Sequence, residues 1–409
     1  MAATTPVFTP KPTQIVDPPP NVASFGATVA AAGDLNGDDV DDILISAPNA
    51  KGAVGQIYAY LGSGGAYPSQ PSWTSSSIES DLPHRLGRLL AAGHDIDGDG
   101  FDDFVASATL RGTSEALYAF RGGPQGPVDE PLSRLAGLTL SSGITSIALC
   151  RDIDGDAFAD LVVGLALHSS SENEQGRINV YYGSPTGFSR TPDWFVIGAQ
   201  AGARLGTAVA CGDVNGDGLD DVLASAPMSG AVVVDPSVDR GYALMFLGSS
   251  RGLSTTPSWE YRTSERDAAF GQTLTIAGDL NGDGLTDLAI GSPRLRSPES
   301  FNLTGRVDIF LARAQGLGTA PDVRLFGSES DSGYGLAVAA LGDVDRDGFA
   351  DLAIGSGRPG TNGVLGTGPA EEGQLVVYRG GREGLAADRF VTVEGNAGPT
   401  GFGFSLAGP

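Results

Sequence analysis

Acidic side chains at alternating positions recur in six nine-residue segments, and they are the chain's clearest candidates for chemistry. The segments begin at Asp34, Asp95, Asp152, Asp213, Asp279 and Asp343, at steps of 57 to 66 residues. Positions 1, 3 and 5 are always Asp or Asn, and position 9 is always Asp. Ca²⁺ takes six to eight oxygen ligands, and alternating side chains of a tight loop can converge on one point. The spacing therefore predicts about six calcium-binding loops.

Each loop is expected to offer four side chains, at positions 1, 3, 5 and 9, and the backbone carbonyl of position 7. The predicted ligands are Asp34, Asn36, Asp38, Val40 and Asp42; Asp95, Asp97, Asp99, Phe101 and Asp103; Asp152, Asp154, Asp156, Phe158 and Asp160; Asp213, Asn215, Asp217, Leu219 and Asp221; Asp279, Asn281, Asp283, Leu285 and Asp287; and Asp343, Asp345, Asp347, Phe349 and Asp351. Gly at position 4 or 6 lets the backbone turn around the ion.

Other uses of these acids fit less well. An EF-hand needs Glu at position 12 and flanking helices, but Ile45 and Ala106 stand there, each in an expected strand. Mg²⁺ would keep more water, and Zn²⁺ would require His or Cys. A single loop could be an Asx-rich hairpin turn, but six copies with Asp or Asn at the same alternating positions favour calcium. Six Ca²⁺ ions would also offset about half of the net charge of −24.

The composition of the 409 residues excludes several classes of protein. The 61 Gly and 25 Pro disfavour a helical fold. The negative charge opposes binding to nucleic acid or to anionic lipid, and no apolar run is long enough for direct membrane insertion. Residues 1–5 show no signal peptide within this numbering.

Four short apolar segments accompany the acidic loops and make up a repeat. An aromatic-glycine or Leu-Gly pair precedes most loops, and runs such as ILISAP, QIYAYLG and SWTSSSI follow. Short runs rich in Val, Ile and Tyr between Gly, Pro, Asn and Ser indicate strands. Four-stranded units in six copies predict an all-β fold, a β-propeller whose blades stack radially.

These residues resemble the FG-GAP repeats of the integrin α-subunit propeller and its bacterial relatives. The segments FGATVAAAGDLNGDDVDDILISAP from Phe25 and FGQTLTIAGDLNGDGLTDLAIGSP from Phe270 carry every part of the pattern. The third copy departs from it, and Arg346 replaces the usual Gly in the sixth loop. The resemblance implies calcium loops between the first and second strands of a blade, and a role in adhesion without catalysis.

Two parts of the chain are expected: a Pro-rich N-terminal segment (1–24) with a closing strand, and a propeller (25–409). The repeats lie near 25–84, 85–141, 142–204, 205–269, 270–333 and 334–401, with a partial seventh at 402–409. In integrin-like propellers the N-terminal strand closes the final blade, so TQIV from Thr13 and FGFSLAGP from Phe402 favour a seven-bladed plan. The alternative is a closed six-bladed propeller.

Few other residues are candidates for a site. Cys150 and Cys211 fall at the same place in consecutive repeats, and free thiols are favoured over a disulfide. Trp73, Trp194 and Trp259 recur at one place, where packing against a neighbouring strand is favoured over stacking on a sugar. The histidines at 84, 94 and 168 are expected in loops or at the surface, and Asn302 begins an N-glycosylation sequon.

Three functions follow in order of preference. The first is a noncatalytic, secreted or surface-bound calcium-binding propeller, part of a larger surface protein, whose partner is a protein or glycan ligand. The second is a glycan-binding propeller lectin. The third is a glycan- or lipid-acting enzyme, which is disfavoured because most conspicuous acids are assigned to calcium.

Overall fold

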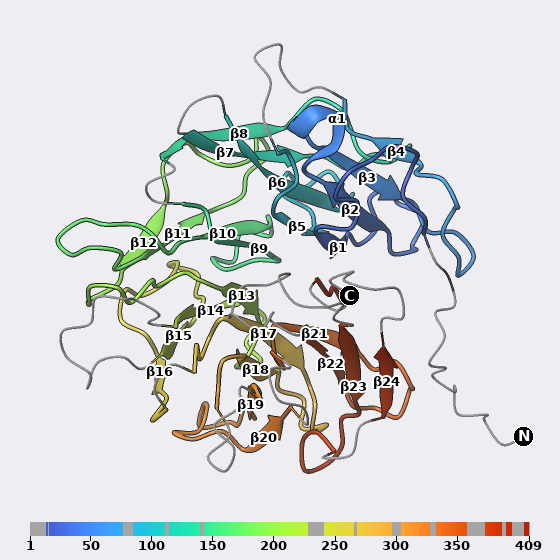
Figure 1. Cartoon of the computed structure of the whole chain (residues 1–409). Coiled ribbons are helices and arrows are strands. Elements are labelled where there is room, and N and C mark those ends of the chain that lie inside the picture. Colours follow the sequence, from blue (N-terminus) through green and yellow to red (C-terminus); the bar gives the residue numbers. More distant parts are fainter. Residues whose placement is uncertain are drawn as a thin grey trace, which may run out of the picture.

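The computed structural model describes residues 14, 16–76, 85–110, 114–139, 143–227, 241–265, 268–296, 304–327, 333–357, 373–386, 390–394 and 405–408. Within these ranges the chain forms six antiparallel four-stranded sheets around a common centre (Figure 1). We number the sheets as blades 1 to 6 in chain order. One short turn, α1 (Ala50–Ala53), connects β2 to β3, and its Lys51 and Gly52 depart from helical geometry.

Each blade is an up-and-down sheet of four consecutive strands. Blade 1 comprises β1 (Val29–Ala31), β2 (Ile43–Ala47), β3 (Gln56–Tyr60) and β4 (Trp73–Thr74). Blade 2 comprises β5 (Leu90–His94), β6 (Asp103–Thr109), β7 (Ser114–Phe120) and β8 (Ser133–Thr139). Blade 3 comprises β9 (Ser146–Cys150), β10 (Asp160–Leu165), β11 (Arg177–Tyr181) and β12 (Trp194–Ile197).

The other three blades repeat this order. Blade 4 comprises β13 (Val209–Gly212), β14 (Asp221–Ala226), β15 (Tyr242–Phe246) and β16 (Trp259–Arg262). Blade 5 comprises β17 (Thr273–Gly278), β18 (Asp287–Ser292), β19 (Arg306–Phe310) and β20 (Val323–Phe326). Blade 6 comprises β21 (Ala337–Gly342), β22 (Asp351–Ser356), β23 (Gln374–Tyr378) and β24 (Val391–Glu394).

The first strand of each blade is the innermost one. Consecutive first strands lie side by side from β1 through β5, β9, β13 and β17 to β21 (Figure 1). The second and third strands are almost wholly buried. This explains their near-continuous apolar sequence, because both of their faces pack against neighbouring blades.

The blade count confirms the six-bladed alternative and not the seven-bladed plan. The described part of the expected seventh repeat, 405–408, forms no strand. It lies between the first and last blades (Figure 1), where the Val29 amide donates to the Ser405 hydroxyl at 3.3 Å and Gly408 lies directly against the Ala340 carbonyl. At the other end, the Gln14 side chain both donates to and accepts from the backbone of Tyr67, in blade 1.

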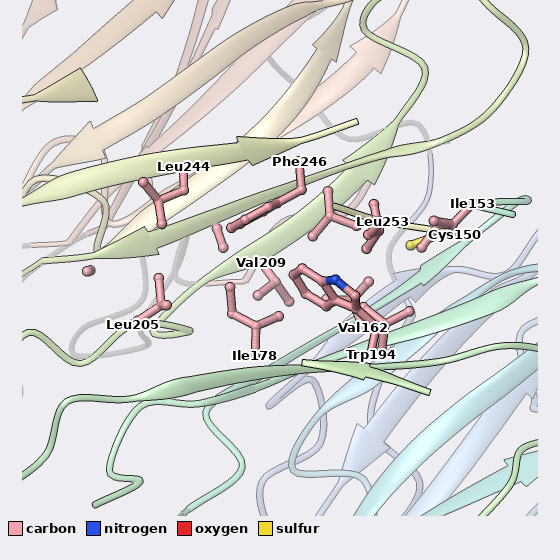
Figure 2. Close-up of a cluster of buried hydrophobic side chains, with 14 of the residues drawn as sticks. Cys150, Ile153, Val162, Ile178, Trp194, Leu205, Val209, Leu244, Phe246 and Leu253 are labelled. Atoms are coloured by element: carbon pink, nitrogen blue, oxygen red, sulfur yellow. The ribbon is translucent and has the colours of Figure 1, made fainter. Parts of the chain in front are cut away.

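Separate hydrophobic clusters join consecutive blades. Figure 2 shows the cluster between blades 3 and 4, where Val162, Ile178 and Trp194 meet Val209, Leu244 and Phe246. Equivalent clusters lie between the other consecutive pairs. Because the core is divided among these interfaces, no blade buries its apolar faces alone.

The three tryptophans belong to these interfaces, which confirms the packing prediction. Trp194 meets Phe246 of the next blade edge-on, with ring centroids 5.1 Å apart. Trp259 meets Phe310 at the same distance, and Trp73 meets Phe104 at 6.1 Å. Edge-to-face contacts of this kind add to the burial of apolar area. The tryptophans therefore pack the outer strands of blades 1, 3 and 4 against the following blade.

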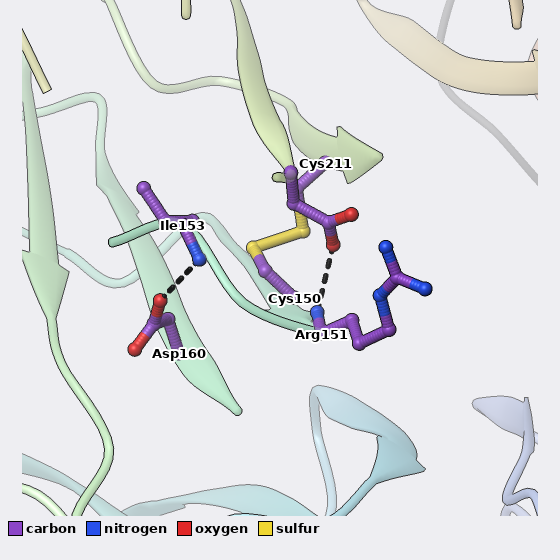
Figure 3. Close-up of a disulfide and its surroundings, with 6 residues drawn as sticks. Cys150, Arg151, Ile153, Asp160 and Cys211 are labelled. Carbon is purple, nitrogen blue, oxygen red and sulfur yellow. Dashed lines mark hydrogen bonds between the residues drawn. A yellow bond between two sulfur atoms is a disulfide. The ribbon is translucent and has the colours of Figure 1, made fainter. Parts of the chain in front are cut away.

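The prediction of free thiols is wrong, because Cys150 and Cys211 form a disulfide (Figure 3). Cys150 ends β9 and Cys211 lies in β13, so the bond joins the innermost strands of blades 3 and 4. Their Cα atoms are 5.6 Å apart. Strand neighbours in consecutive repeats were foreseeable from the sequence, but their separation depends on how the two blades pack.

Removal of this disulfide should destabilise the protein markedly. The bond closes a loop of 61 residues, for which loop-closure entropy gives about 4 kcal/mol. We expect the C150S/C211S variant to lose this amount in denaturant-induced unfolding. The unmodified protein should fall to the same stability in reductant, which should leave the variant unchanged. Equal stability of the variant and the oxidised protein would contradict the prediction.

Among the described residues, no helix has the length and apolar character needed to span a bilayer.

Candidate metal centres

The six acidic segments form six loops, each connecting the first strand of a blade to the second. Loops 1 to 6 comprise residues 34–42, 95–103, 152–160, 213–221, 279–287 and 343–351. Position 9 is the last residue of the loop and borders or begins the second strand. Each loop is thus held between two paired strands of one sheet.

The Asp at position 1 organises the backbone of its loop. In loop 1, Oδ1 of Asp34 accepts the amides of Gly37 at 2.6 Å and Asp38 at 3.0 Å, and Oδ2 accepts the amide of Asp39 at 2.7 Å. Burial alone would raise the pKa of Asp34, but the backbone amides outweigh it and lower that pKa. Position 1 of the other loops accepts amide bonds in the same way. These bonds curl the loop around its acidic side chains.

The carboxylates converge in three of the six loops. In each of these, one oxygen from each of three aspartates lies within 4.8 Å of the others. The groups are Asp95, Asp97 and Asp99 in loop 2; Asp152, Asp154 and Asp160 in loop 3; and Asp343, Asp345 and Asp347 in loop 6. Oδ1 of the position-3 aspartate is buried without a hydrogen-bond partner in all three. A buried carboxylate oxygen facing other carboxylates has the properties of a cation ligand.

Loops 1, 4 and 5 have Asn at position 3. Its side-chain amide donates to the position-5 carboxylate: Asn36 to Asp38 at 3.5 Å, Asn215 to Asp217 at 3.0 Å and Asn281 to Asp283 at 3.1 Å. The Asn carbonyl oxygen remains a ligand of the kind that Ca²⁺ accepts. These three loops therefore carry one negative charge fewer, and part of their repulsion is relieved within the loop.

The position-9 aspartates have a role that the sequence analysis missed. Asp103 is fully buried. Its Oδ2 accepts the Ile96 amide at 2.8 Å, and its Oδ1 accepts the Gly122 amide, just after β7, at 2.8 Å. The same two bonds recur at position 9 of the other five blades. These side chains thus fasten the loop to the third strand, whether or not they also contact an ion.

Burial raises the pKa of these position-9 carboxyls. The pKa rises to about 7 for Asp103, Asp160 and Asp287. Backbone amides oppose this rise, and neighbouring loop carboxylates reinforce it. A nearby cation favours the charged form of a carboxyl whose charge is disfavoured in this way. The loops are therefore suited to bind a divalent ion near neutral pH.

Neighbouring loops are connected to one another. The position-8 amide of one blade donates to the position-1 carbonyl of the preceding loop, as from Asp102 to Asp34 at 3.0 Å and from Ala159 to Asp95 at 2.9 Å. The position-7 side chain also covers the position-4 glycine of the preceding loop. A Cβ on Gly98 would lie 2.7 Å from the Phe158 ring. An ion that orders one loop therefore also orders a contact between blades.

The other candidate residues do not form a site in the described part of the chain. His94 ends β5 and is partly buried, and burial lowers its pKa. His168 follows β10 in a partly buried turn. His84 and Asn302 lie outside the described residues.

Family models match more than half of the chain. The FG-GAP repeat matches residues 25–60, 86–128, 270–310 and 334–378, and the FG-GAP-like repeat matches residues 152–224. The chain belongs to the FG-GAP repeat family. Its six acidic loops are therefore the acidic loops of an integrin α-like FG-GAP propeller.

Curated relatives of this FG-GAP propeller include integrin chains. Integrin alpha-PS5 of Drosophila melanogaster is 36% identical over 174 residues, 41% of this chain and 16% of the relative. Integrin alpha-V of Gallus gallus is 31% identical over 211 residues, 50% of this chain and 18% of the relative. The match thus spans less than a fifth of either relative. Among solved structures, "Structure of Dos1 propeller" aligns over 91% of this chain and 76% of that chain, with 11% identity and a TM-score of 0.44.

Proposed function

We propose that this chain is a noncatalytic, extracellular calcium-binding β-propeller that mediates cell adhesion or protein–protein interaction. Calcium has a structural role in it, with about six ions held by the six loops. The observation that carries the proposal is the convergence of three carboxylates in loops 2, 3 and 6 around buried, unpartnered oxygens. Because such oxygens have no hydrogen-bond partner, a cation that takes oxygen ligands would stabilise them.

The ligands of each ion are proposed to be the side chains at positions 1, 3 and 5, the position-7 carbonyl and the position-9 carboxylate. Each position-9 oxygen accepts one amide and keeps a second lone pair for an ion. Hard carboxylate and carbonyl oxygens favour Ca²⁺ over Zn²⁺, which takes nitrogen and sulfur. A shell of five protein ligands favours Ca²⁺ over Mg²⁺, which keeps several waters.

The extracellular setting is supported by the disulfide. Cys150 and Cys211 are bonded within a described interface between blades. Structural disulfides persist chiefly in oxidising compartments. Extracellular calcium-binding modules bind calcium in the range of 10⁻⁴ to 10⁻³ M, so calcium and oxidation would both favour the folded propeller outside the cell.

The adhesion role rests on the family. The curated relatives are integrin α chains, and in this chain the six sheets carry connecting loops between their strands. Protein partners are favoured over glycans because the three recurring tryptophans pack between blades. The attachment of this propeller to a larger surface protein is part of the proposal.

Calcium titration calorimetry on protein freed of metal tests the proposal directly. We expect about six bound Ca²⁺ per chain, with weaker binding of Mg²⁺. The D95N/D97N/D99N variant should lose one site and leave the others, because the loops lie in different blades. Absence of calcium binding by the intact protein, or a stoichiometry unaffected by these substitutions, would refute the proposal. A glycan array and a panel of polysaccharide and phospholipid substrates would detect the lectin and enzyme alternatives.

A further inference from the structure

The residue that directly follows the third strand differs among the blades. It is Arg121 in blade 2 and Arg379 in blade 6, whereas blades 1, 3, 4 and 5 carry Leu61, Tyr182, Leu247 and Leu311. The amide of the next residue donates to the position-9 carboxylate of the same blade, as Gly122 does to Asp103. A side chain at this place is therefore held beside the acidic loop.

Both arginines contact the position-3 aspartate of their own loop. Nη1 of Arg121 lies 3.5 Å from Oδ2 of Asp97, and Nε of Arg379 lies 2.6 Å from Oδ2 of Asp345. The two aspartate side chains are only 4% and 3% exposed, whereas the arginines are 43% and 37% exposed. In both pairs the arginine faces Oδ2, and Oδ1 is buried without a hydrogen-bond partner. The guanidinium thus occupies one side of the carboxylate and leaves the other available to an ion.

Loop 3 has the same four acidic positions without an arginine. Tyr182 stands at the equivalent place, and its hydroxyl accepts the Leu253 amide at 3.4 Å. The carboxylates of Asp152, Asp154 and Asp160 converge there, without the arginine contact that Asp97 and Asp345 receive in loops 2 and 6. Arg151, directly before loop 3, instead donates to the Gly218 carbonyl of loop 4 at 3.0 Å. Loop 3 thus carries the least compensated negative charge of the three loops in which carboxylates converge.

We propose that Arg121 and Arg379 are tethered cations that stabilise loops 2 and 6 without calcium and lower their calcium affinity, so that loop 3 fills first among the three. This inference rests on the proposed calcium function. It deepens that function by assigning an order of filling to sites that the repeat pattern makes equivalent.

The positive charge of the arginine has opposite effects on the calcium-free and the calcium-bound loop. Without calcium, a guanidinium beside the position-3 carboxylate offsets the repulsion among four acids. With calcium, the same positive charge repels the ion across a short distance. Because both arginines are more than one third exposed, water screens their effect. We therefore expect a change of about three- to fivefold in affinity, the size typical of exposed ion pairs.

Substitution of Arg121 tests the inference, because Arg379 also stacks on Phe390 at 3.5 Å and its loss would disturb packing. Calcium titration calorimetry and thermal melts in EDTA should be recorded for R121L and for R190L. Arg190 is an exposed residue between β11 and β12, so its removal changes the net charge equally away from the loops. Relative to R190L, we expect R121L to bind calcium about three- to fivefold more tightly at one site and to have a lower melting temperature in EDTA.

The reverse substitution keeps the inference testable if R121L fails to fold. Y182R should place a guanidinium beside Asp154 and weaken one of the tightest sites. Equal affinities in R121L and R190L, weaker calcium binding by R121L, or unchanged binding by Y182R would overturn the inference. Absence of calcium binding by the unmodified protein would instead refute the calcium function itself, so the two failures are distinguishable.

Discussion

Chelation of calcium is expected to lower the melting temperature of this propeller by about 10 °C. A site at ten times its Kd stabilises the folded state by about 1.4 kcal/mol, so six sites contribute about 8 kcal/mol. For a chain of 409 residues, this corresponds to roughly 1.2 °C per kcal/mol from average unfolding entropies. The loops connect strands that carry the interfaces between blades, so loss of the ions should weaken the whole ring.

The measurement is a pair of calorimetric scans, one in millimolar calcium and one in EDTA. Scans at several calcium concentrations should show a melting temperature that rises with the logarithm of free calcium, since only the folded state binds. A scan in magnesium controls for screening of the net charge of −24. Identical melting temperatures in calcium and EDTA would mean that the loops are turns that bind no stabilising ion, and the proposed function would lose its main physical support.

The second large effect is expected at the position-9 aspartates. Asp160 is fully buried, and its Oδ2 accepts the Ile153 amide at 2.6 Å (Figure 3). Its Oδ1 accepts the Gly183 amide at 2.9 Å. Leaving a buried backbone amide without its hydrogen-bond partner costs about 1 to 3 kcal/mol, so D160A, which leaves two, should lose about 2 to 6 kcal/mol. Because both partners are backbone amides, we expect a loss in calcium and in EDTA.

Asp154 in the same loop provides a matched control. Its Oδ1 has no hydrogen-bond partner, so D154A should lose about 1.4 kcal/mol in calcium. In EDTA it should cost little, because removal of one carboxylate relieves repulsion. Denaturant unfolding of both variants under both conditions separates the two roles. Equal calcium dependence of D154A and D160A would show that position 9 acts mainly as a metal ligand.

Much of the architecture could be predicted from the sequence because the repeat shows where the strands lie and that each unit needs neighbours to bury its apolar faces. Alternation around QIYAYLG and its counterparts predicts strands, and six copies of a unit with two apolar faces predict radial stacking. The number of blades was harder to predict. FGFSLAGP from Phe402 has the sequence of a first strand, but a blade needs three further strands to pair with it.

The details of the candidate sites depended on contacts between parts of the chain that the repeat pattern does not relate. The Asp103 side chain binds Gly122, nineteen residues away, and no spacing rule for calcium ligands includes that bond. The Arg121–Asp97 contact likewise requires the third strand to end beside the loop. Cys150 and Cys211 were recognisable as neighbours, but whether neighbours bond depends on a distance of a few ångströms.

In loops 1 to 5 a side chain of the next blade covers position 4, whereas position 4 of loop 6 is exposed, so the repeats differ in their surroundings. Gly98 has φ +77° and Arg346, at the same position of loop 6, has φ +62°, so this backbone conformation favours glycine but also admits another residue. Glycine is demanded where an aromatic ring from the following blade lies over it, as Phe158 lies over Gly98; Arg346 is exposed. The residue that fits at position 4 of a loop therefore depends on the side chain about sixty residues later in the chain that covers it. If the sixth repeat replaced the second, its arginine would lie beneath an aromatic side chain of the following blade. The repeats are therefore not interchangeable, and the fold depends on their order in the chain.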